Sequence, residues 1–272
     1  MTLRRLDAEL TRRGLARSRE HAQALIDEGN VLVRGSIARK AATRVDSGDP
    51  ILVSRGEEHS WVSRGARKLL GALDAFVDLP VEGRYALDAG ASTGGFTQVL
   101  LSRGAAGVVA VDVGYGQIAW SLREDARVYL LERTNVRYLQ ETQLPWKPEL
   151  ITGDLSFISL EVVLPALLTC LTDEGDLCLL VKPQFEVGRE YVKRGVVRDP
   201  DQHIGALTGV ANALQTAGCS IMGVIASPLL GPAGNREFFL WARRATVPPV
   251  RALRGANVDS AILEVVSQVF GE

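Results

Sequence analysis

Between residues 85 and 241 the sequence alternates short apolar runs with longer segments of helical pattern. The longer segments predict helices at 94–103, 158–171 and 201–217. Apolar strands that alternate with helices are typical of a parallel sheet covered by helices on both faces. The alternation therefore predicts an α/β fold with a doubly wound, mostly parallel sheet, whose first five strands cover 85–88, 108–112, 128–131, 150–151 and 177–181.

Two more apolar runs, 219–225 and 237–241, follow one another without a helix between them. A parallel connection needs a crossover of a dozen or more residues, whereas antiparallel strands need only a short one. We therefore expect an antiparallel pair at one edge, which brings the sheet to seven strands. Helices are predicted before the sheet, at about 64–77, and after it, at 261–270.

The N-terminal part of the chain has a different pattern and a different charge. Helices are predicted at 5–13 and after Ser18, a favourable N-cap residue, and short strands at 31–33 and 51–53. Residues 1–44 hold ten Lys and Arg but only five Asp and Glu, whereas the whole chain has a net charge of −1. We expect a small basic α+β domain at 1–58, a linker at 59–62 and a larger, slightly acidic domain at 63–272.

Composition excludes several classes of protein. The chain has no run of about 18 apolar residues that could span a bilayer, and its charged start, MTLRRLDAELTRRG, lacks the apolar core of a signal peptide. We therefore expect a cytoplasmic protein with no membrane partner. The three cysteines and three histidines are scattered without metal-ligand spacing, so no metal site is predicted. No feature indicates an oligomeric state.

A glycine-rich loop lies between the first strand of the sheet and its helix, in ALDAGASTGGFTQVLL (86–101). Such glycines let backbone N–H groups approach a ligand at a helix N-terminus. The order of residues differs from the dinucleotide pattern G-x-G-x-x-G. Asp88, two residues before the first glycine, suits a ligand that carries an ammonium group. The loop therefore favours S-adenosylmethionine over NAD.

The ends of the next two strands fit the same ligand. Asp112 ends the second strand, where an acid accepts hydrogen bonds from a ribose diol. Asn135 and Val136 follow the third strand, along the expected adenine edge. The predicted cofactor-binding residues are Asp88, Gly90, Ala91, Ser92, Thr93, Gly94, Gly95, Phe96, Asp112, Val113, Asn135, Val136 and Asp154.

Charged residues follow the last two parallel strands. Asp154 follows one in LITGDLSFISL, and Lys182 follows the next in DLCLLVKPQFE. Ligands of doubly wound sheets bind outside the carboxyl ends of the strands, so both side chains should face the crevice of the glycine loop. Glu237, in GNREFFLW, reaches the same edge only if its strand is antiparallel.

These motifs together resemble the TlyA family, sometimes labelled "hemolysin A". LARSREHAQALIDEGNVLVRG resembles an S4 RNA-binding domain. DAGASTGGFT, VDVGYGQ, TNVR, GDLSFISL, LLVKPQFEVG and GPAGNREFF resemble FtsJ-like methyltransferases. The resemblance implies a Rossmann-like class I methyltransferase domain that transfers a methyl group from S-adenosylmethionine to the ribose 2′-hydroxyl of cytidines in 23S and also 16S rRNA. The family linker Arg-Ala-Trp-Val corresponds to 59–62, where Trp61 and Val62 agree.

The resemblance also implies roles for particular residues. The family's catalytic tetrad falls on Lys68, Asp154, Lys182 and Glu237. Lys182 then acts as the base for the ribose hydroxyl or as a cation that stabilises its developing charge, since burial favours the neutral amine and nearby carboxylates favour the ammonium. Arg4, Arg5, Arg17, Arg19 and Lys40, with the other arginines up to residue 19, are expected to contact rRNA phosphates. A solvated helical face is the alternative interpretation of these basic residues.

Three functions are alternatives to rRNA methylation. An S4-linked RNA-binding protein with a non-catalytic methyltransferase fold is disfavoured by the intact tetrad. A membrane-lytic protein is disfavoured by the absence of a long apolar segment. An NAD-dependent oxidoreductase is disfavoured by the glycine-loop pattern.

Overall fold

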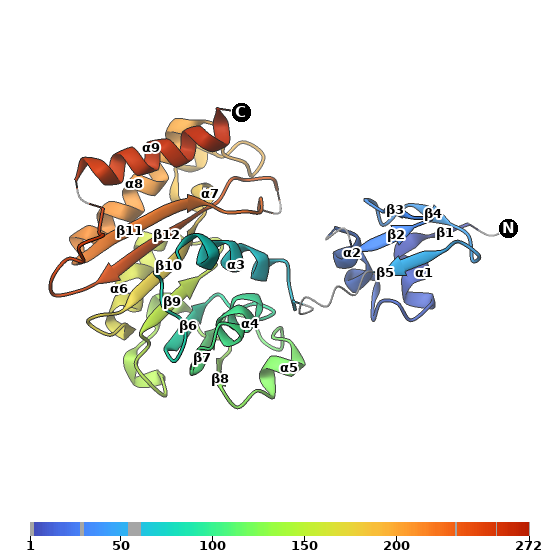
Figure 1. Ribbon diagram of the computed structural model, residues 1–272, viewed down its shortest axis with the longest axis horizontal. Coiled ribbons are helices and arrows are strands. Elements are labelled where there is room, and N and C mark those ends of the chain that lie inside the picture. Colours follow the sequence, from blue (N-terminus) through green and yellow to red (C-terminus); the bar gives the residue numbers. More distant parts are fainter. Residues whose placement is uncertain (1–2, 28–29, 54–60, 232, 254, 272) are drawn as a thin grey trace. The chain divides into compact units, whose positions relative to one another are not determined.

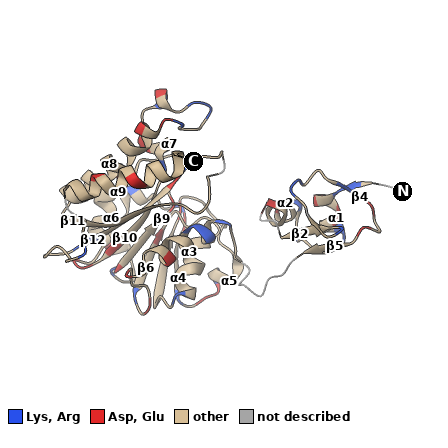
Figure 2. Ribbon diagram, turned by 45° about the horizontal axis from the view of Figure 1, so that its top comes forward, with Lys and Arg blue, Asp and Glu red and all other residues tan. Residues whose placement is uncertain are grey.

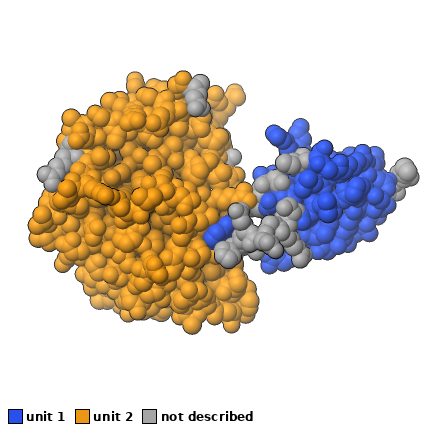
Figure 3. All heavy atoms as spheres, viewed as in Figure 1, with its two compact units in different colours: residues 1–61 blue, residues 62–272 orange. Residues whose placement is uncertain are grey.

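The computed structural model describes residues 3–27, 30–53, 61–231, 233–253 and 255–271. It divides into two compact units, residues 1–61 and 62–272 (Figure 1, Figure 3). Of the predicted linker, His59 and Ser60 lie outside the described residues.

The first unit joins two helices to small antiparallel sheets. β1 (Arg4–Arg5) pairs with β4 (Arg44–Val45), and β2 (Val31–Val33) pairs with both β3 (Ser36–Ile37) and β5 (Ile51–Val53). α1 spans Leu6–Arg12 and α2 spans Arg19–Asp27. Ser18 caps α2 as predicted, because its hydroxyl accepts a 3.1 Å hydrogen bond from the backbone N–H of His21. The core of this unit includes Leu6, Leu10, Ile26, Val31 and Val45.

The second unit is built on a seven-stranded sheet in the order β11-β12-β10-β9-β6-β7-β8. Five strands, from β10 to β8 in this order, are parallel, and β12 runs antiparallel to both β10 and β11. The predicted doubly wound sheet with an antiparallel edge is therefore confirmed. The strands are β6 (Tyr85–Ala89), β7 (Gly107–Val111), β8 (Val128–Leu131), β9 (Leu150–Gly153), β10 (Asp176–Val181), β11 (Cys219–Ala226) and β12 (Phe238–Arg244).

Helices cover both faces of this sheet (Figure 1). The α-helices are α3 (Gly65–Ala75), α4 (Gly95–Ser102), α5 (Trp120–Arg123), α6 (Leu160–Cys170), α7 (Pro183–Glu186), α8 (Pro200–Thr216) and α9 (Ala256–Phe270). Short 3-10 helices cover Val136–Tyr138, Glu141–Gln143 and Arg189–Tyr191.

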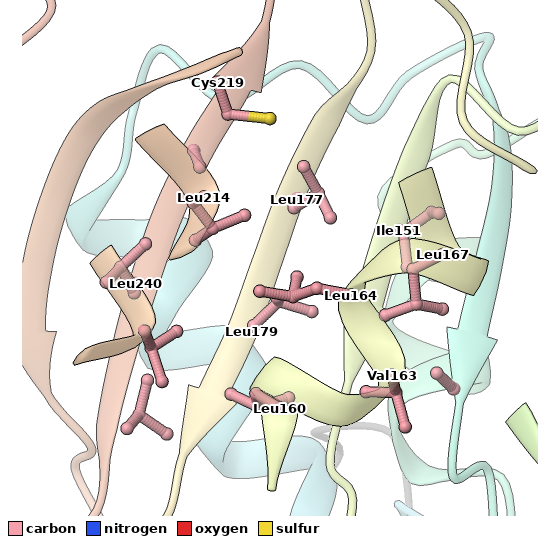
Figure 4. Packing of buried hydrophobic residues seen from close by; sticks show 14 of the residues in the cluster. Ile151, Leu160, Val163, Leu164, Leu167, Leu177, Leu179, Leu214, Cys219 and Leu240 are labelled. Carbon is pink, nitrogen blue, oxygen red and sulfur yellow. The ribbon is translucent and has the colours of Figure 1, made fainter. Parts of the chain in front are cut away.

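Alternation along the strands divides the core between the two faces. Leu177, Leu179 and Val181 of β10 belong to the cluster that packs under α6, α8 and α9, part of which Figure 4 shows. On the opposite face, Phe239 of β12 packs against Phe96 of α4, with ring centroids 6.0 Å apart. Because both faces are buried, every residue of β10 is buried, and polar side chains are confined to the ends of this strand.

Candidate active site and RNA-binding residues

The register of the sheet places Lys182 beside Glu237. Val181, the last residue of β10, pairs with Phe238, the first residue of the antiparallel β12. Lys182 follows Val181 and Glu237 precedes Phe238, so both lie at the same edge of the sheet. β9 runs parallel to β10 and ends at Gly153, which brings Asp154 to this edge as well. The condition on which Glu237 depended, an antiparallel last strand, is met.

Helix α3 supplies a fourth charged side chain, Lys68, which sequence spacing could not place. Its Nζ donates a 2.6 Å hydrogen bond to Glu237 Oε2 and lies 4.0 Å from Asp154 Oδ2. Lys182 Nζ lies 2.5 Å from the other carboxylate oxygen of Asp154, Oδ1. The two groups form an ion pair whose angles do not meet those of a hydrogen bond. The four residues thus form a chain of alternating charge, in the order Glu237, Lys68, Asp154, Lys182.

These charges are largely withdrawn from water. Lys68, Lys182 and Glu237 are 5%, 7% and 2% exposed, while the Asp154 side chain is 22% exposed. Charges buried to this degree are costly unless they are paired, and here each positive group lies beside a negative one. Asp154 is therefore the member of the chain that is most accessible from solvent.

Two loops that carry these residues are linked to each other at several points. Lys182 Nζ donates a 2.8 Å hydrogen bond to Ser156 Oγ, which sequence reasoning missed. Phe157, at a positive φ of 65° and 91% exposed, packs its ring against Phe185 with centroids 5.1 Å apart. The half-buried carboxylate of Glu186 accepts hydrogen bonds from Ser159 Oγ and the Leu160 N–H. The loops after β9 and β10 are thus held together around Lys182.

The glycine loop lies at the same edge. Its residues follow β6 and lead into the first turn of α4, with positive φ at Gly90 (84°), Ser92 (49°) and Gly94 (95°). A Cβ on Gly90 would lie 2.9 Å from the backbone oxygen of Asp154. Gly90 is therefore required both by its backbone conformation and by the close approach of the loop to Asp154.

Asp88, at the end of β6, is fully buried beside this loop. Its Oδ2 accepts a 2.7 Å hydrogen bond from Thr97 Oγ1, a second contact that sequence reasoning missed. Its Oδ1 has no hydrogen-bond partner within the described ranges. Burial raises the pKa of Asp88 to about 7, and the charges of Asp154 and Asp112 act in the same direction.

Asp112 is held firmly at the end of β7. Its two carboxylate oxygens accept hydrogen bonds from the backbone N–H groups of Ser92 (2.8 Å) and Gly114 (2.7 Å). Val113, next to it, is 67% exposed, as an apolar residue that meets a ligand would be. A small cavity beside Asp112 is lined by Ala91, Ser92, Ala110, Asp112, Gly114, Gln117, Ile118, Leu130 and Glu132.

Three predicted cofactor residues can act only in part. The Phe96 side chain is 3% exposed and packs against Phe239. Val136 is 4% exposed and belongs to the core cluster. Both can therefore meet a ligand only through the backbone. The Asn135 side chain already accepts a 3.0 Å hydrogen bond from the Arg137 N–H, as the N-cap of the 3-10 helix that follows.

Acidic residues lie among the basic residues along the ribbon of the first unit (Figure 2), and several of them form ion pairs that the charge count did not reveal. Glu9 has no exposed side-chain surface and accepts hydrogen bonds from Arg12 and Arg13, which lower its pKa to about 2. Arg4 lies 3.8 Å from the same carboxylate. Asp7 similarly pairs with Arg5 and lies 3.8 Å from Arg19.

Arg13, one of the arginines predicted to contact phosphates, has several partners within the first unit. Beyond Glu9, its guanidinium donates to the carbonyls of Asp46, Ser47 and Asp49, so it fastens α1 to the loop before β5. Arg17 and Lys40 are exposed and have no acidic partner in the described parts of the chain. These two basic side chains remain available to an anion.

Two further observations concern metals and membranes. Within the described ranges, no cluster of three or more His, Cys, Asp or Glu side chains could hold a metal ion. The helices among the same residues include none of the length and hydrophobicity that crossing a membrane requires.

The fold and the site define a methyltransferase architecture with an appended RNA-binding module, and family models agree with it. Residues 61–244 match the FtsJ-like methyltransferase family, and residues 4–51 match the S4 domain. This agreement covers most of both units.

Individual relatives identify one family within the FtsJ-like methyltransferases. The chain is 52% identical, over 97% of both sequences, to the "16S/23S rRNA (cytidine-2'-O)-methyltransferase TlyA" of Mycobacterium tuberculosis. It is 36% identical, over 66% of its length and 70% of the relative, to the "23S rRNA (cytidine-2'-O)-methyltransferase TlyA" of Campylobacter jejuni. A solved structure titled "Putative hemolysin from Streptococcus thermophilus" is 38% identical and covers 100% of this chain and 97% of its own, with a TM-score of 0.76. The chain belongs to the TlyA family of FtsJ-like methyltransferases.

Proposed function

We propose that this protein methylates the ribose 2′-hydroxyl of cytidines in ribosomal RNA, in the large subunit and also in the small one. The observation that carries the proposal is the buried chain of alternating charge, Glu237–Lys68–Asp154–Lys182, at the sheet edge that also holds the glycine loop. The extension to both subunits rests on the relative that matches over 97% of each chain, whose name includes 16S and 23S rRNA.

The residues around the glycine loop fit S-adenosylmethionine, which supplies an activated methyl group when it is bound. Asp88 offers a buried carboxylate oxygen that lacks a partner in the described structure, suited to an ammonium. Asp112 is oriented by two backbone N–H groups, and a carboxylate oxygen can still accept from a ribose hydroxyl. Val113 offers an exposed apolar side chain for the adenine. The pattern of loop, acid and apolar residue therefore supports this cofactor.

We propose that Lys182 binds the ribose hydroxyl and stabilises its developing charge. An ammonium has three N–H donors, and Ser156 accepts one of them. A remaining donor can bind the 2′-oxygen and stabilise the negative charge that develops as the hydroxyl loses its proton. Asp154, the most exposed carboxylate of the chain of charges, can accept the hydrogen of the same hydroxyl. Orientation of the hydroxyl by these two groups contributes in addition, because the reaction is an in-line displacement.

Lys68 and Glu237 hold Asp154 and the sheet edge in place. Glu237 is 2% exposed and binds Lys68 at 2.6 Å, so this pair is the more deeply buried end of the chain of charges. The positive charge of Lys68, 4.0 Å from Asp154, keeps that carboxylate near Lys182. We therefore assign Lys68 and Glu237 to positioning of the groups that meet the ribose.

We propose that the first unit binds the RNA through exposed basic residues, that the partner is ribosomal RNA within a subunit, and that the protein acts in the cytoplasm. Contacts to phosphates contribute affinity that depends strongly on salt, and they position the substrate without reading its sequence. Selection of the cytidine then depends on the shape of the RNA around it.

The proposal is tested by mapping 2′-O-methylation on both ribosomal subunits from cells with and without this protein, by mass spectrometry. We expect methylated cytidines in 23S and 16S rRNA only when the protein is present. In purified form, Lys182→Ala should abolish methylation and keep S-adenosylmethionine binding, whereas Lys147→Ala, at an exposed ion pair with Glu141, should leave both unchanged. Equal methylation by wild type and Lys182→Ala would contradict the role of Lys182. Absence of any methylation by the wild type would contradict the proposed activity.

A further inference from the structure

Asp7 joins two arginines that come from separate segments of the first unit. Arg5 ends β1, and Arg19 begins α2. Arg5 donates through Nε and Nη2 to the two carboxylate oxygens of Asp7, at 3.1 and 3.0 Å. Arg19 Nε lies 3.8 Å from Asp7 Oδ2. One carboxylate therefore fixes the spacing of two guanidinium groups that the chain alone does not hold together.

Asp7 is largely buried, whereas the side chains of Arg5 and Arg19 extend into solvent. The Asp7 side chain is 10% exposed, while those of Arg5 and Arg19 are 47% and 61% exposed. The three residues line an open groove together with Glu20 and Gln23. A ligand that enters this groove meets the guanidinium groups of Arg5 and Arg19 before it meets the Asp7 carboxylate.

Asp7 itself is anchored. Its Oδ1 accepts a 2.8 Å hydrogen bond from the backbone N–H of Ala8 in α1. The hydrogen bonds from Arg5, above all, lower the pKa of Asp7, so the carboxylate is ionised at neutral pH. An anchored anion of this kind holds the Arg5 fork in one orientation.

The neighbouring acid Glu9 shows what a purely structural pair looks like in the same unit. Its side chain is fully buried, and its partner Arg13 uses its remaining N–H groups on backbone carbonyls. Arg5, in contrast, donates to Asp7 through Nε and Nη2, and its other guanidinium N–H groups make no hydrogen bond among the described residues. Arg4 and Arg12 beside Glu9 are also 48% exposed, but only the Asp7 cluster lines the groove described above.

We propose that Asp7 is a positioning residue for RNA binding, which holds Arg5 and Arg19 as a ready-made pair for a backbone phosphate. Guanidinium groups bind phosphate through paired N–H donors, and a side chain held in place before binding loses less conformational entropy on binding. Two guanidinium groups and two carboxylates, those of Asp7 and Glu20, line the groove, so its formal charge is balanced and phosphate binding depends on how the two arginines are oriented. This inference rests on the proposed function, since it presumes that the first unit binds RNA.

The inference predicts an effect opposite to that of simple electrostatics. From electrostatics alone, removal of a negative charge near RNA strengthens binding. Asp7→Asn should instead weaken binding, because the charge that holds both arginines is lost. The asparagine oxygen can still accept from the Ala8 N–H, so the start of α1 is kept. Glu20→Gln is the matched control, because Glu20 lines the same groove and pairs with no arginine among the residues described.

The experiment measures binding of the full-length protein to purified, unmethylated 50S subunits over a range of salt concentrations. Asp7→Asn should bind about five- to thirtyfold more weakly than wild type at physiological salt, with a shallower salt dependence. Glu20→Gln should bind as tightly as wild type or more tightly. In methylation assays Asp7→Asn should raise KM for subunits and leave kcat unchanged, a split that a general loss of folding would not produce.

The outcomes distinguish failure of the role of Asp7 from failure of RNA binding by the first unit. Wild-type binding together with equal or tighter binding by Asp7→Asn overturns the role of Asp7. Equal weakening by Glu20→Gln also overturns it, because the effect is then not specific to the arginine pair. A wild-type protein that binds subunits without any salt dependence contradicts RNA binding by this unit, and the inference about Asp7 fails with it.

Discussion

Lys182 Nζ lies 2.5 Å from Asp154 Oδ1 because the two residues follow neighbouring parallel strands that end at the same edge of the sheet. Neither residue belongs to a strand, so the sheet defines their positions while the loops determine their orientation. Ser156 and Glu186 supply this orientation through hydrogen bonds between the two loops. The relationship therefore depends on both the fold and a small set of loop contacts.

The buried pair Lys68–Glu237 predicts a characteristic pattern of stability. Lys68→Met leaves Glu237 buried without its positive partner, and Glu237→Leu leaves Lys68 with only the more distant Asp154, 4.0 Å away. Each single variant should lose about 3 kcal/mol or more of unfolding free energy, as expected when one partner of a buried ion pair is removed. Urea denaturation at pH 7 measures the loss.

The double variant Lys68→Met/Glu237→Leu supplies the control for that prediction. With both charges gone, no unpaired buried charge remains, so its unfolding free energy should be closer to wild type than that of either single variant. Methylation should be strongly reduced in all three. Additive losses in the double variant would show that the pair is not coupled as its 2.6 Å contact implies.

Ser156 predicts a graded effect on turnover. Its hydroxyl accepts a hydrogen bond from Lys182 Nζ, and Ser156 itself is exposed to solvent. Ser156→Ala should lower kcat by about three- to tenfold, less than the full value of a hydrogen bond to a charged group, because water can replace the hydroxyl there. Ser156→Thr keeps the hydroxyl and should restore most of the rate. Single-turnover methylation with saturating subunits measures kcat, and an unchanged rate in Ser156→Ala would remove Ser156 from the mechanism.

Sequence patterns predicted the second unit well because each signal was local. Apolar runs of five residues marked strands buried on both faces, and the glycine loop marked the start of α4. Since parallel strands end at a common edge, the proximity of Asp154 and Lys182 also followed from the order of elements. Glu237 required one further condition, the direction of β12, which the absence of a helix before it indicated.

What residue spacing alone did not predict depends on contacts between distant segments. Lys68 meets Glu237 across 169 positions, and no spacing rule connects a helix before the sheet to its last strand. Thr97 and Ser156 are ordinary hydroxyl residues until the fold places them beside Asp88 and Lys182. The net positive charge of the first unit likewise concealed that Asp7 and Glu9 bind its arginines, because a count of charges carries no geometry.

Asp88 predicts that cofactor binding depends on pH. Its burial raises the pKa to about 7, so the carboxylate that should pair with the ligand's ammonium is largely protonated below that pH. The Kd for S-adenosylmethionine should therefore fall by about tenfold per pH unit as pH rises towards 7, and level off above it. Calorimetric titration from pH 5.5 to 8.5 measures the profile, and Asp88→Asn should flatten it and weaken binding at pH 8.

The same group has the opposite effect on stability in the protein without ligand. Because the folded pKa lies above the ordinary value of 3.8, the folded protein retains a proton that the unfolded chain releases. Stability from this group is present below pH 3.8 and is lost as pH rises through 7. Asp88→Asn should thus unfold at a higher urea concentration than wild type at pH 8, with a smaller difference at pH 5.5. A destabilised Asp88→Asn at pH 8 would contradict the assigned pKa.

Gly90 offers a test of how closely the glycine loop is fitted to the site. Gly90 and Gly116 both have positive φ, 84° and 69°, so alanine at either position costs about 1 kcal/mol or more in backbone strain. A Cβ at Gly116 meets nothing within 4 Å, whereas at Gly90 it lies 2.9 Å from the backbone oxygen of Asp154. Gly90→Ala must therefore also displace Asp154 and with it the contact to Lys182. We expect Gly116→Ala to lose only stability and to methylate at close to the wild-type rate below its melting temperature. Gly90→Ala should lose at least about a hundredfold in kcat even where it is fully folded by circular dichroism, and equal rates for the two variants would show that Asp154 tolerates the shift.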